Sequence, residues 1–314
     1  MSSFADHFMA LKFSQRAVGR GIAAGLVAAL VPSASLPAPA PLPAPAFLPT
    51  KDAIPQLTPA RDMSWQVNFW DYLLEPPPGS GHGPIKTDPA YPYNSQIQNG
   101  ALFRDGELQN SIVNAKDPVL KPWAAKQMQE SNEALLSGKA KLSFRAQSRC
   151  WPGGVPGQLL FLEPVYFLQT PTKVVMLWQR NSLARHIFLT DKHSANVKPS
   201  WSGESIGHYE NGDTLVVDTV GLAAGKYHYI DNFRTPHSDK MHVVERFTVA
   251  PDGKSLTAIV TVEDPETFNE PLTLKQVWRR TNLAIEESVC AEDGGVDRFA
   301  QNLDPIPVAA KPDF

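Results

Sequence analysis

The sequence predicts an all-β protein whose core is an antiparallel, up-and-down barrel of about eight to ten strands, preceded by an extension that contains one helix. Three observations lead to this prediction. Short runs of β-branched and aromatic residues follow one another closely after residue 150, tight turns separate them, and no helical pattern intervenes. A meander of this length favours closure, because a flat sheet would leave two exposed edges. A lipocalin-like barrel of this size holds one small ligand.

Alternating apolar residues place about nine short strands in the barrel domain. The strongest hairpin signals are Asn211-Gly212 and Asp252-Gly253, since both dipeptides favour the turns that join antiparallel strands. The expected strands are residues 159–169, 173–180, 184–190, 205–210, 213–220, 241–249, 255–263, 272–280 and 284–290.

The remainder of the chain divides by composition. We expect a signal peptide at residues 1–40, a Pro/Ala-rich linker at 41–62, an irregular arm at 63–140 and the barrel domain at 141–314. The arm carries one predicted helix, about residues 122–138, with Pro122 in its first turn and Gly138 as its stop. Trp123, Met128 and Leu135 or Leu136 form its apolar stripe.

The N-terminus has the order of a signal peptide. Lys12, Arg16 and Arg20 precede the apolar run 21–31, and small residues follow at 33–40. Because a bilayer span needs roughly 20 apolar residues, this run favours a cleaved signal over a stable membrane anchor. We therefore expect a periplasmic or secreted protein, with a buried helix or anchor as the alternative.

Charge and motifs exclude several classes of partner. A net charge of -3 provides no basic field for nucleic acid. The glycine-rich segment 151–157 lacks the Gly-Lys-Ser/Thr of a phosphate loop, and there is no Gly-x-Ser-x-Gly elbow. No close His or Cys motif indicates a metal. We expect no cofactor and no metal, and the alternative is a metal site assembled from histidines far apart in the sequence. The sequence does not indicate an oligomeric state.

The chain contains two cysteines, Cys150 and Cys290. An oxidising compartment favours a disulfide between them, and two separate buried thiols are the alternative. Closure of so long a loop stabilises the fold by about 4 kcal/mol in the chain-entropy description.

Two carboxylates are expected on apolar strand faces. Glu245 alternates with Val243 and Phe247, and Glu287 lies between Ile285 and Val289. Burial would raise the pKa of either carboxyl and suit it to general acid or base chemistry. The alternative is a structural ion pair with an arginine such as Arg185, Arg279 or Arg280.

His237 is the best candidate for proton transfer, because it lies in a long connection expected to fold over the barrel mouth. A histidine that caps a surface turn is the alternative. Asp218 is a candidate to orient a histidine, although periodicity does not decide which way it points. The predicted catalytic set is thus His237, Glu245, Asp218 and Glu287. The predicted substrate-binding residues are Arg185, Trp201, His208, Tyr229, Phe247 and Trp278.

The segment from Trp201 to Thr219 resembles a group of exported bacterial proteins with the pattern W-x-G-x-S-I-G-x-W-E-G-D-T-L-V-V-D-T. The likeness extends to Pro236-His237-Ser238, to the surroundings of both cysteines and to residues 243–247. Tyr209 replaces the second tryptophan, and Asn211 lengthens the hairpin loop by one residue. The resemblance implies export and a shared fold, and it carries over no activity.

The sequence therefore favours an exported, cofactor-independent enzyme that acts on a small, partly hydrophobic organic molecule by lyase, isomerase or hydrolase chemistry. The alternative is a periplasmic, lipocalin-like carrier that binds a small hydrophobic ligand without turnover. A third hypothesis is a structural exported protein whose Pro-rich arm engages a partner.

Overall fold

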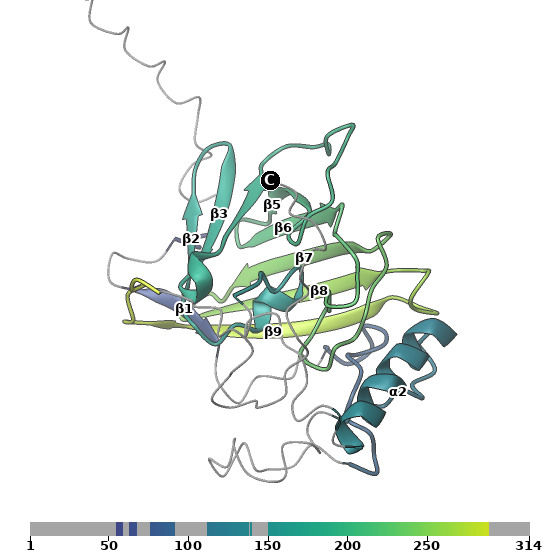
Figure 1. The fold of residues 1–314 in the computed structure, drawn as a ribbon. Helices are drawn as coiled ribbons and strands as arrows, with labels where there is room; N and C mark the ends of the chain where they lie inside the picture. The colour runs from purple at the N-terminus through teal and green to yellow at the C-terminus, as the bar shows by residue number, and fades with distance from the viewer. Residues whose placement is uncertain are drawn as a thin grey trace, which may run out of the picture. The chain divides into compact units, whose positions relative to one another are not determined.

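Nine strands close into a barrel in the part of the chain that the computed structural model describes, residues 55–58, 63–67, 76–91, 112–137, 139 and 150–288 (Figure 1). Each strand pairs with the next in sequence, and the last strand, β9, pairs with the first, β1. The predicted all-β barrel is confirmed.

The strands are short, and connections of three to five residues join β2 to β3, β3 to β4, β5 to β6 and β7 to β8. They are β1 (Ser64–Val67), β2 (Val165–Gln169), β3 (Lys173–Trp178), β4 (Ala184–Phe188), β5 (Glu204–Glu210), β6 (Thr214–Val220), β7 (His242–Val249), β8 (Ser255–Glu263) and β9 (Leu272–Thr281). One α-helix, α2 (Pro122–Leu136), and two 3-10 turns, η3 (Gly157–Leu160) and η4 (Arg180–Ser182), complete the described elements. In the predicted hairpin between β5 and β6, Asn211 and Gly212 both have positive φ, 52° and 73°.

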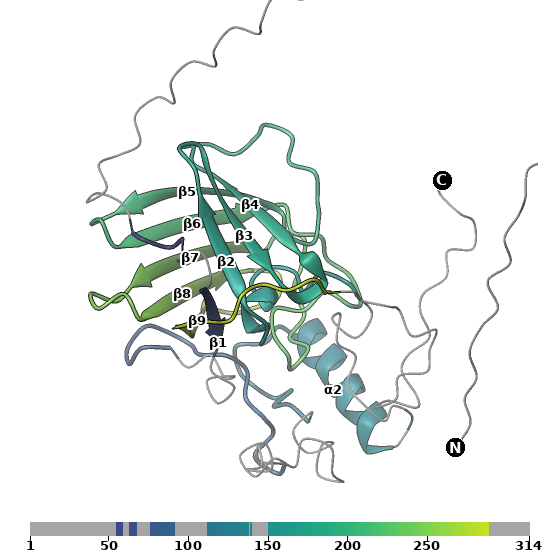
Figure 2. The ribbon, with the colours of Figure 1, turned by 90° about the vertical axis from the view of Figure 1, so that its left-hand side faces the viewer.

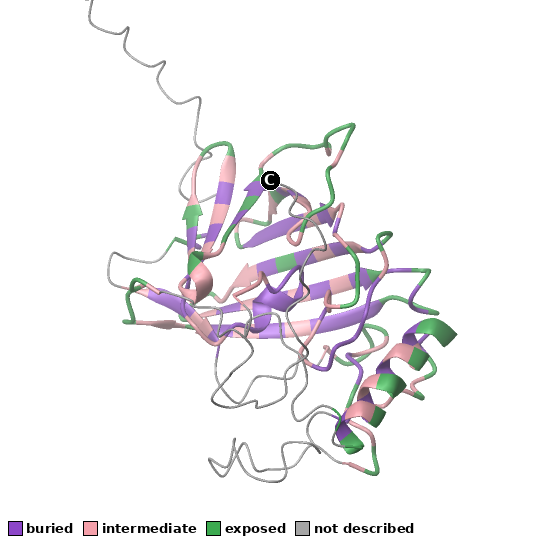
Figure 3. Ribbon diagram, viewed as in Figure 1, coloured by how far each residue is buried: buried purple, intermediate pink, exposed green. Residues whose placement is uncertain are grey.

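Alternation along the strands separates a packed interior from the outer face, as the bands in Figure 3 show. On β8, Leu256, Ala258, Val260 and Val262 are fully buried, and the residues between them are not. Large side chains fill the interior, so the barrel is a packed core rather than an open cup. They include Trp65, Phe167, Trp178, Phe247 and Trp278.

One strand pair departs from the predicted antiparallel meander. β4 and β5 run parallel, and only two residue pairs, Ile187 with Ser205 and Phe188 with Ile206, define their register. A parallel pair requires a crossover that returns the chain to the same end, and the connection 189–203 provides it. Figure 2 shows β2–β4 running across β5–β9 at a steep angle. We call this short junction the β4–β5 seam.

The strand that closes the barrel is β1, not the predicted strand 284–290. β1 pairs with β9 at four positions, from Ser64 with Thr281 to Val67 with Trp278. Residues 283–288 form no ladder, and Glu287 is exposed there, so its expected place on an inward apolar face is wrong. The physical reason is that β1 supplies the buried Trp65, whereas the described part of the predicted strand, residues 284–288, mixes acidic and apolar residues and buries no comparable side chain.

The two ends of the barrel are covered by non-strand segments. At one end, η3 replaces the start of the predicted strand 159–169, and Gln276 Nε2 on β9 donates to Leu159 O at 3.1 Å. At the other end, the segment Pro55–Thr58 docks against β2. Gln169 Oε1 accepts from the backbone N of Leu57 at 3.0 Å, and Trp65 Nε1 donates to Leu57 O at 2.8 Å.

The helix α2 packs through one face and ends at Leu136, two residues before the predicted stop. Met128 and Leu135 are buried, and the Asn132 amide donates to Val113 O at 2.8 Å. Trp123 is exposed, contrary to its predicted place in the apolar stripe, and its indole N–H donates to Glu266 O at 2.7 Å. The helix is thus tied to the connection between β8 and β9.

Several predictions fall outside the described residues. The signal peptide 1–40, most of the linker 41–62, and Cys290 are among them, so export and the Cys150 to Cys290 disulfide stay predictions. Among the described residues, no helix has both the length and the apolar character needed to cross a bilayer.

Gly207 on β5 is a test of how closely the seam is packed. A Cβ at this position would lie 2.8 Å from Val216 O and 2.9 Å from Ile187 Cγ2, and a backbone oxygen in a ladder has little freedom to move. We expect Gly207→Val to lower the free energy of unfolding in urea by about 1–3 kcal/mol. Thr257→Val on β8 is the control, and equal stability of the two variants would contradict the packing.

Candidate functional site

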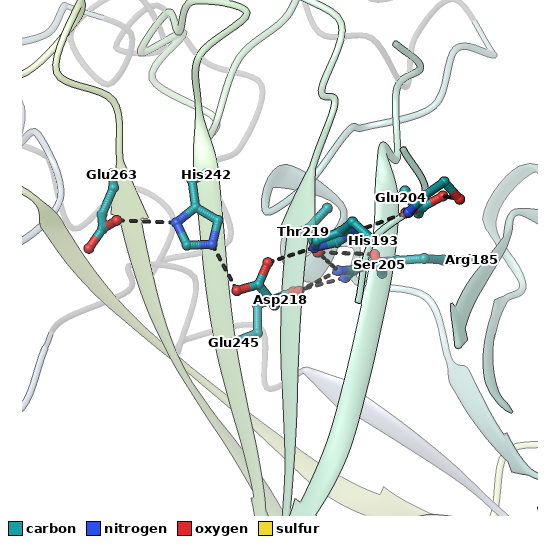
Figure 4. Close-up of polar contacts among 10 residues, drawn as sticks. Arg185, His193, Glu204, Ser205, Asp218, Thr219, His242, Glu245 and Glu263 are labelled. Carbon is teal, nitrogen blue, oxygen red and sulfur yellow. Dashed lines mark hydrogen bonds and ion pairs between the residues drawn. The ribbon is translucent and has the colours of Figure 1, made fainter. Parts of the chain in front are cut away.

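Two polar networks lie on opposite faces of the same strands, at the same level of the barrel (Figure 4). The inner network consists of Arg185, Ser205, Thr219 and Glu245. The outer network consists of His193, Glu204, Asp218, His242 and Glu263. Because successive side chains point to opposite faces, the neighbours Glu204 and Ser205, and likewise Asp218 and Thr219, contribute one residue to each network.

The inner network centres on a buried ion pair across four strands. Arg185 on β4 contacts both carboxylate oxygens of Glu245 on β7, with Nη1 2.9 Å from Oε1 and Nη2 in close contact with Oε2. Its Nε donates to Ser205 Oγ at 3.1 Å, and Nη2 donates to Thr219 Oγ1 at 2.9 Å. The two hydroxyls lie 3.0 Å apart. The guanidinium is therefore held by β5, β6 and β7 together.

Because both side chains are buried, the charges of Arg185 and Glu245 must stay paired. Arg185 is 1% exposed and Glu245 is 0% exposed, so either charge alone would carry a large desolvation penalty. Two parallel N–H donors on one carboxylate are the geometry in which guanidinium binds most firmly. The prediction that Glu245 lies among apolar residues is confirmed. Of the two roles considered for it, acid/base chemistry and an ion pair with arginine, the structure shows the ion pair.

The outer network is a row of alternating carboxylates and imidazoles. His193 Nδ1 lies 3.1 Å from Glu204 Oε1, and His193 Nε2 lies 2.9 Å from Asp218 Oδ1. His242 Nε2 lies 2.9 Å from the other oxygen of Asp218, and His242 Nδ1 lies 3.1 Å from Glu263 Oε2. Both nitrogens of each ring face a carboxylate, and only the imidazolium form donates from both.

The pKa shifts in this row follow from the contacts. Burial lowers the pKa of His242, but its hydrogen bonds to Asp218 and Glu263 outweigh burial and raise that pKa overall. Burial raises the pKa of Asp218, but hydrogen bonds from the two histidines outweigh it and lower that pKa. The hydrogen bond from the Ser194 hydroxyl lowers the pKa of Glu204. The row thus favours charged acids beside a charged His242.

A cleft of about 420 Å³ opens at the β4–β5 seam. Its lining residues include Arg185 and Ser205 of the inner network and Glu204 of the outer network. We call it the seam cleft. Its other lining residues come from β4 and from the crossover 189–203, and they are Ala184, His186, Phe188, Asn196, Val197, Lys198, Ser202 and Gly203.

His237 belongs to a different cluster, in the connection between β6 and β7. It is buried, and its Nδ1 lies 2.9 Å from Ser238 O. Burial lowers the pKa of His237 and, more strongly, that of His228, to about 4, so both rings are neutral at pH 7. Trp201 stacks on His228 with ring centroids 3.9 Å apart. In the described residues, no hydrogen bond or ion pair joins His237 to Glu245.

The remaining predicted residues are dispersed. Phe247 and Trp278 lie in the packed interior, 6.1 Å apart between ring centroids. His208 is exposed on β5 with Nε2 2.9 Å from Glu210 Oε1, and Tyr229 forms an isolated bridge with Pro236. Asp218 points outward from β6 and contacts two histidines, His193 and His242, in agreement with its predicted role of orienting a histidine. The structure brings together Arg185 and Glu245, but not the full predicted set.

Sequence reasoning missed His193, Glu204, Ser205 and Thr219 as members of these networks. His193 lies in an irregular crossover, where no periodicity indicates which way a side chain points. Ser205 and Thr219 could have been identified from strand alternation, because each lies on the same strand face as buried residues.

The described residues contain no group of three or more His, Cys, Asp and Glu side chains arranged to hold a metal ion. No family model matches the chain, and the search of curated proteins found no match. The resemblance of residues 201–219 to exported proteins therefore stays a prediction, and the chemistry of the site rests on its geometry.

Removal of one partner from the buried ion pair is the direct test of the inner network. We expect Glu245→Gln to lower the free energy of unfolding by about 3–5 kcal/mol, because it leaves the Arg185 charge buried without its carboxylate. The double variant Arg185→Met/Glu245→Met removes both charges and is expected to recover most of that loss. Urea unfolding followed by tryptophan fluorescence measures both, and a double variant as unstable as the single one would contradict this account.

The raised pKa of His242 makes part of the stability depend on pH. The stabilisation is fully present below the unfolded pKa of about 6.5 and is lost as pH rises through the higher folded pKa. We therefore expect His242→Asn to cost more stability at pH 5.5 than at pH 8.5, as measured by urea unfolding. His208→Asn is the control, since that ring is 60% exposed and contacts one carboxylate. An equal loss from His242→Asn at both pH values would refute the linkage.

Proposed function

We propose that this protein binds a small amphipathic organic molecule with an acidic head group at the seam cleft. The observation that carries the proposal is a cleft of about 420 Å³ at the β4–β5 seam, whose lining combines apolar side chains with the cation Lys198 and other polar residues. Sites for small molecules commonly enclose about 300–1,000 Å³ and combine apolar walls with a few fixed polar groups. The seam cleft has both features.

The lining residues divide by chemistry. Ala184, Phe188 and Val197 offer apolar surface for the body of a ligand. Lys198 adds a cation at the crossover side, and Asn196 and Ser202 add uncharged polar side chains. Carboxylate or sulfonate oxygens match this set of donors.

Binding is better supported than acid/base catalysis. A general base needs a carboxylate that is free to take a proton, whereas both oxygens of Glu245 contact Arg185. His237, the other proposed member of the acid/base pair, contacts Ser238 instead. The carrier is therefore our proposal, ahead of the lyase, isomerase or hydrolase.

The proposal includes the setting that the sequence suggests. Lys12, Arg16 and Arg20 before the apolar run 21–31 support export, and an oxidising compartment supports a Cys150 to Cys290 bridge. A carrier of this kind would work in the periplasm or outside the cell.

The fluorescent anion 8-anilinonaphthalene-1-sulfonate tests the site, because it combines an aromatic body with a sulfonate. We expect saturable binding of about one dye per chain, with a blue-shifted emission. Ala184→Trp fills the seam cleft and should abolish the signal, and Lys198→Glu should weaken affinity roughly fivefold through loss of charge attraction. Thr261→Trp on β8 is the matched control. Dye binding unchanged by Ala184→Trp would overturn the proposal.

A further inference from the structure

We propose that a second cleft, at the end of the β4–β5 seam, binds an extended peptide segment as an additional strand on the free edge of β5. The cleft encloses about 420 Å³ between residues 189–191, residues 207–209 and the turn that joins β2 to β3. We call it the edge cleft. It shares no lining residue with the seam cleft, and its occupant does not depend on the proposed function.

The edge cleft takes the place of three missing strand pairs. The β4–β5 ladder ends at Phe188 with Ile206. In the same parallel register the next pairs would be Leu189 with Gly207, Thr190 with His208 and Asp191 with Tyr209, and these six residues all line the cleft. Because successive side chains point to opposite faces, a cleft that contacts three residues in a row on each side lies along two main-chain edges.

Hydrogen bonds within the protein hold the β4 side of the gap away from β5. Leu189 N donates to Thr172 O at 2.9 Å, which ties the chain to the β2–β3 turn. Thr190 N donates to Phe188 O at 3.0 Å, a three-residue turn of the kind found at strand ends. Both backbone donors are therefore used without β5, and the gap is part of the fold.

The opposite wall is a sheet edge with free backbone groups. β5 pairs with β6 along its whole length, from Glu204 to Glu210, but with β4 at only two positions. In an antiparallel ladder, every second residue directs its N–H and C=O away from the neighbouring strand. In the described part of the chain, no strand pairs with residues 207–210 on that side. An edge of this kind binds extended peptides through main-chain hydrogen bonds.

The side-chain amide of Gln169 fixes the remaining wall. Its Nε2 donates to Tyr209 OH on β5 at 3.1 Å and to Pro55 O at 2.9 Å, and its Oε1 accepts from Thr58 N at 3.1 Å. Since the Tyr209 oxygen accepts this bond, its own hydrogen is available to donate to a ligand. A wall that is already held in place loses little freedom when a peptide binds.

Asp191 sets the preferred charge of the peptide. Its side chain is exposed, and its carboxylate has no hydrogen bond or ion pair with a described residue. The ring of His208, also at the edge cleft, contacts Glu210 instead. A cationic side chain in the bound segment is therefore favoured over an anionic one.

A short labelled peptide tests the edge cleft. The probe is fluorescently labelled Thr-Val-Lys-Val-Thr amide, because β-branched residues favour an extended chain. We expect saturable binding by fluorescence anisotropy. Two further forms carry methyl groups on one or the other alternate set of backbone nitrogens. The form whose methylated set faces β5 should bind about tenfold more weakly, since it keeps its side chains but loses main-chain donors. Equal binding of all three forms, or binding of none, would overturn the proposal.

Substitutions in the protein locate the peptide. Thr190→Trp fills the edge cleft from an exposed position and should abolish binding, whereas Thr261→Trp on β8 should leave it unchanged. Circular dichroism verifies the fold of each variant. A probe with Glu in place of its Lys should bind about fivefold more weakly, and Asp191→Asn should remove that preference. Binding that survives Thr190→Trp would contradict the site.

Hydrogen exchange tests the same contact in the wild-type protein. We expect the bound probe to slow exchange at those amides of residues 207–210 that point away from β6, and to leave the amides of β8 unchanged. A probe that binds without slowing exchange at residues 207–210 would occupy another surface, and strand addition to β5 would be wrong.

Discussion

The part of the barrel that carries the inner and outer networks depends on the buried ion pair between Arg185 and Glu245. The pair spans the interior from β4 to β7, and Ser205 and Thr219 on the two strands between them complete the hydrogen bonds. This matters most at the β4–β5 seam, where only two residue pairs define the ladder. The guanidinium bonds across that junction from inside, so side chains supply cohesion that the backbone pairing lacks.

The seam cleft and the outer network follow from the same strands. Glu204 and Asp218 point outward immediately beside Ser205 and Thr219, which point inward. A shift of one residue in the register of β5 or β6 would exchange the two sets and place acids in the core. The inner ion pair and the outer row of histidines therefore both require the same register of β5 and β6. His193 also ties the crossover 189–203 to these two strands, through Glu204 and Asp218.

Much of the barrel could be predicted, because period-two alternation and the Asn211 and Gly253 turns are local signals. Alternation also placed Glu245 correctly among apolar residues. The closing strand could not be predicted: β1 pairs with β9, whereas the sequence suggested a last strand at 284–290. Closure depends on which distant segment buries more apolar surface, and β1 buries Trp65. The partner of Glu245 and the place of His193 were equally hidden, because both contacts join strands or loops far apart in sequence.

The pairing of β1 with β9 sets the timing of folding. Ser64 meets Thr281, so the ring of strands is complete only after the chain has been synthesised past β9. Until then, the sheet β1–β8 has two unpaired edges, and the loop to be closed spans most of the domain. Such non-local closure makes folding slow and leaves the unfinished sheet open to pairing with other chains. We therefore expect aggregation to compete with folding mainly before β9 pairs with β1.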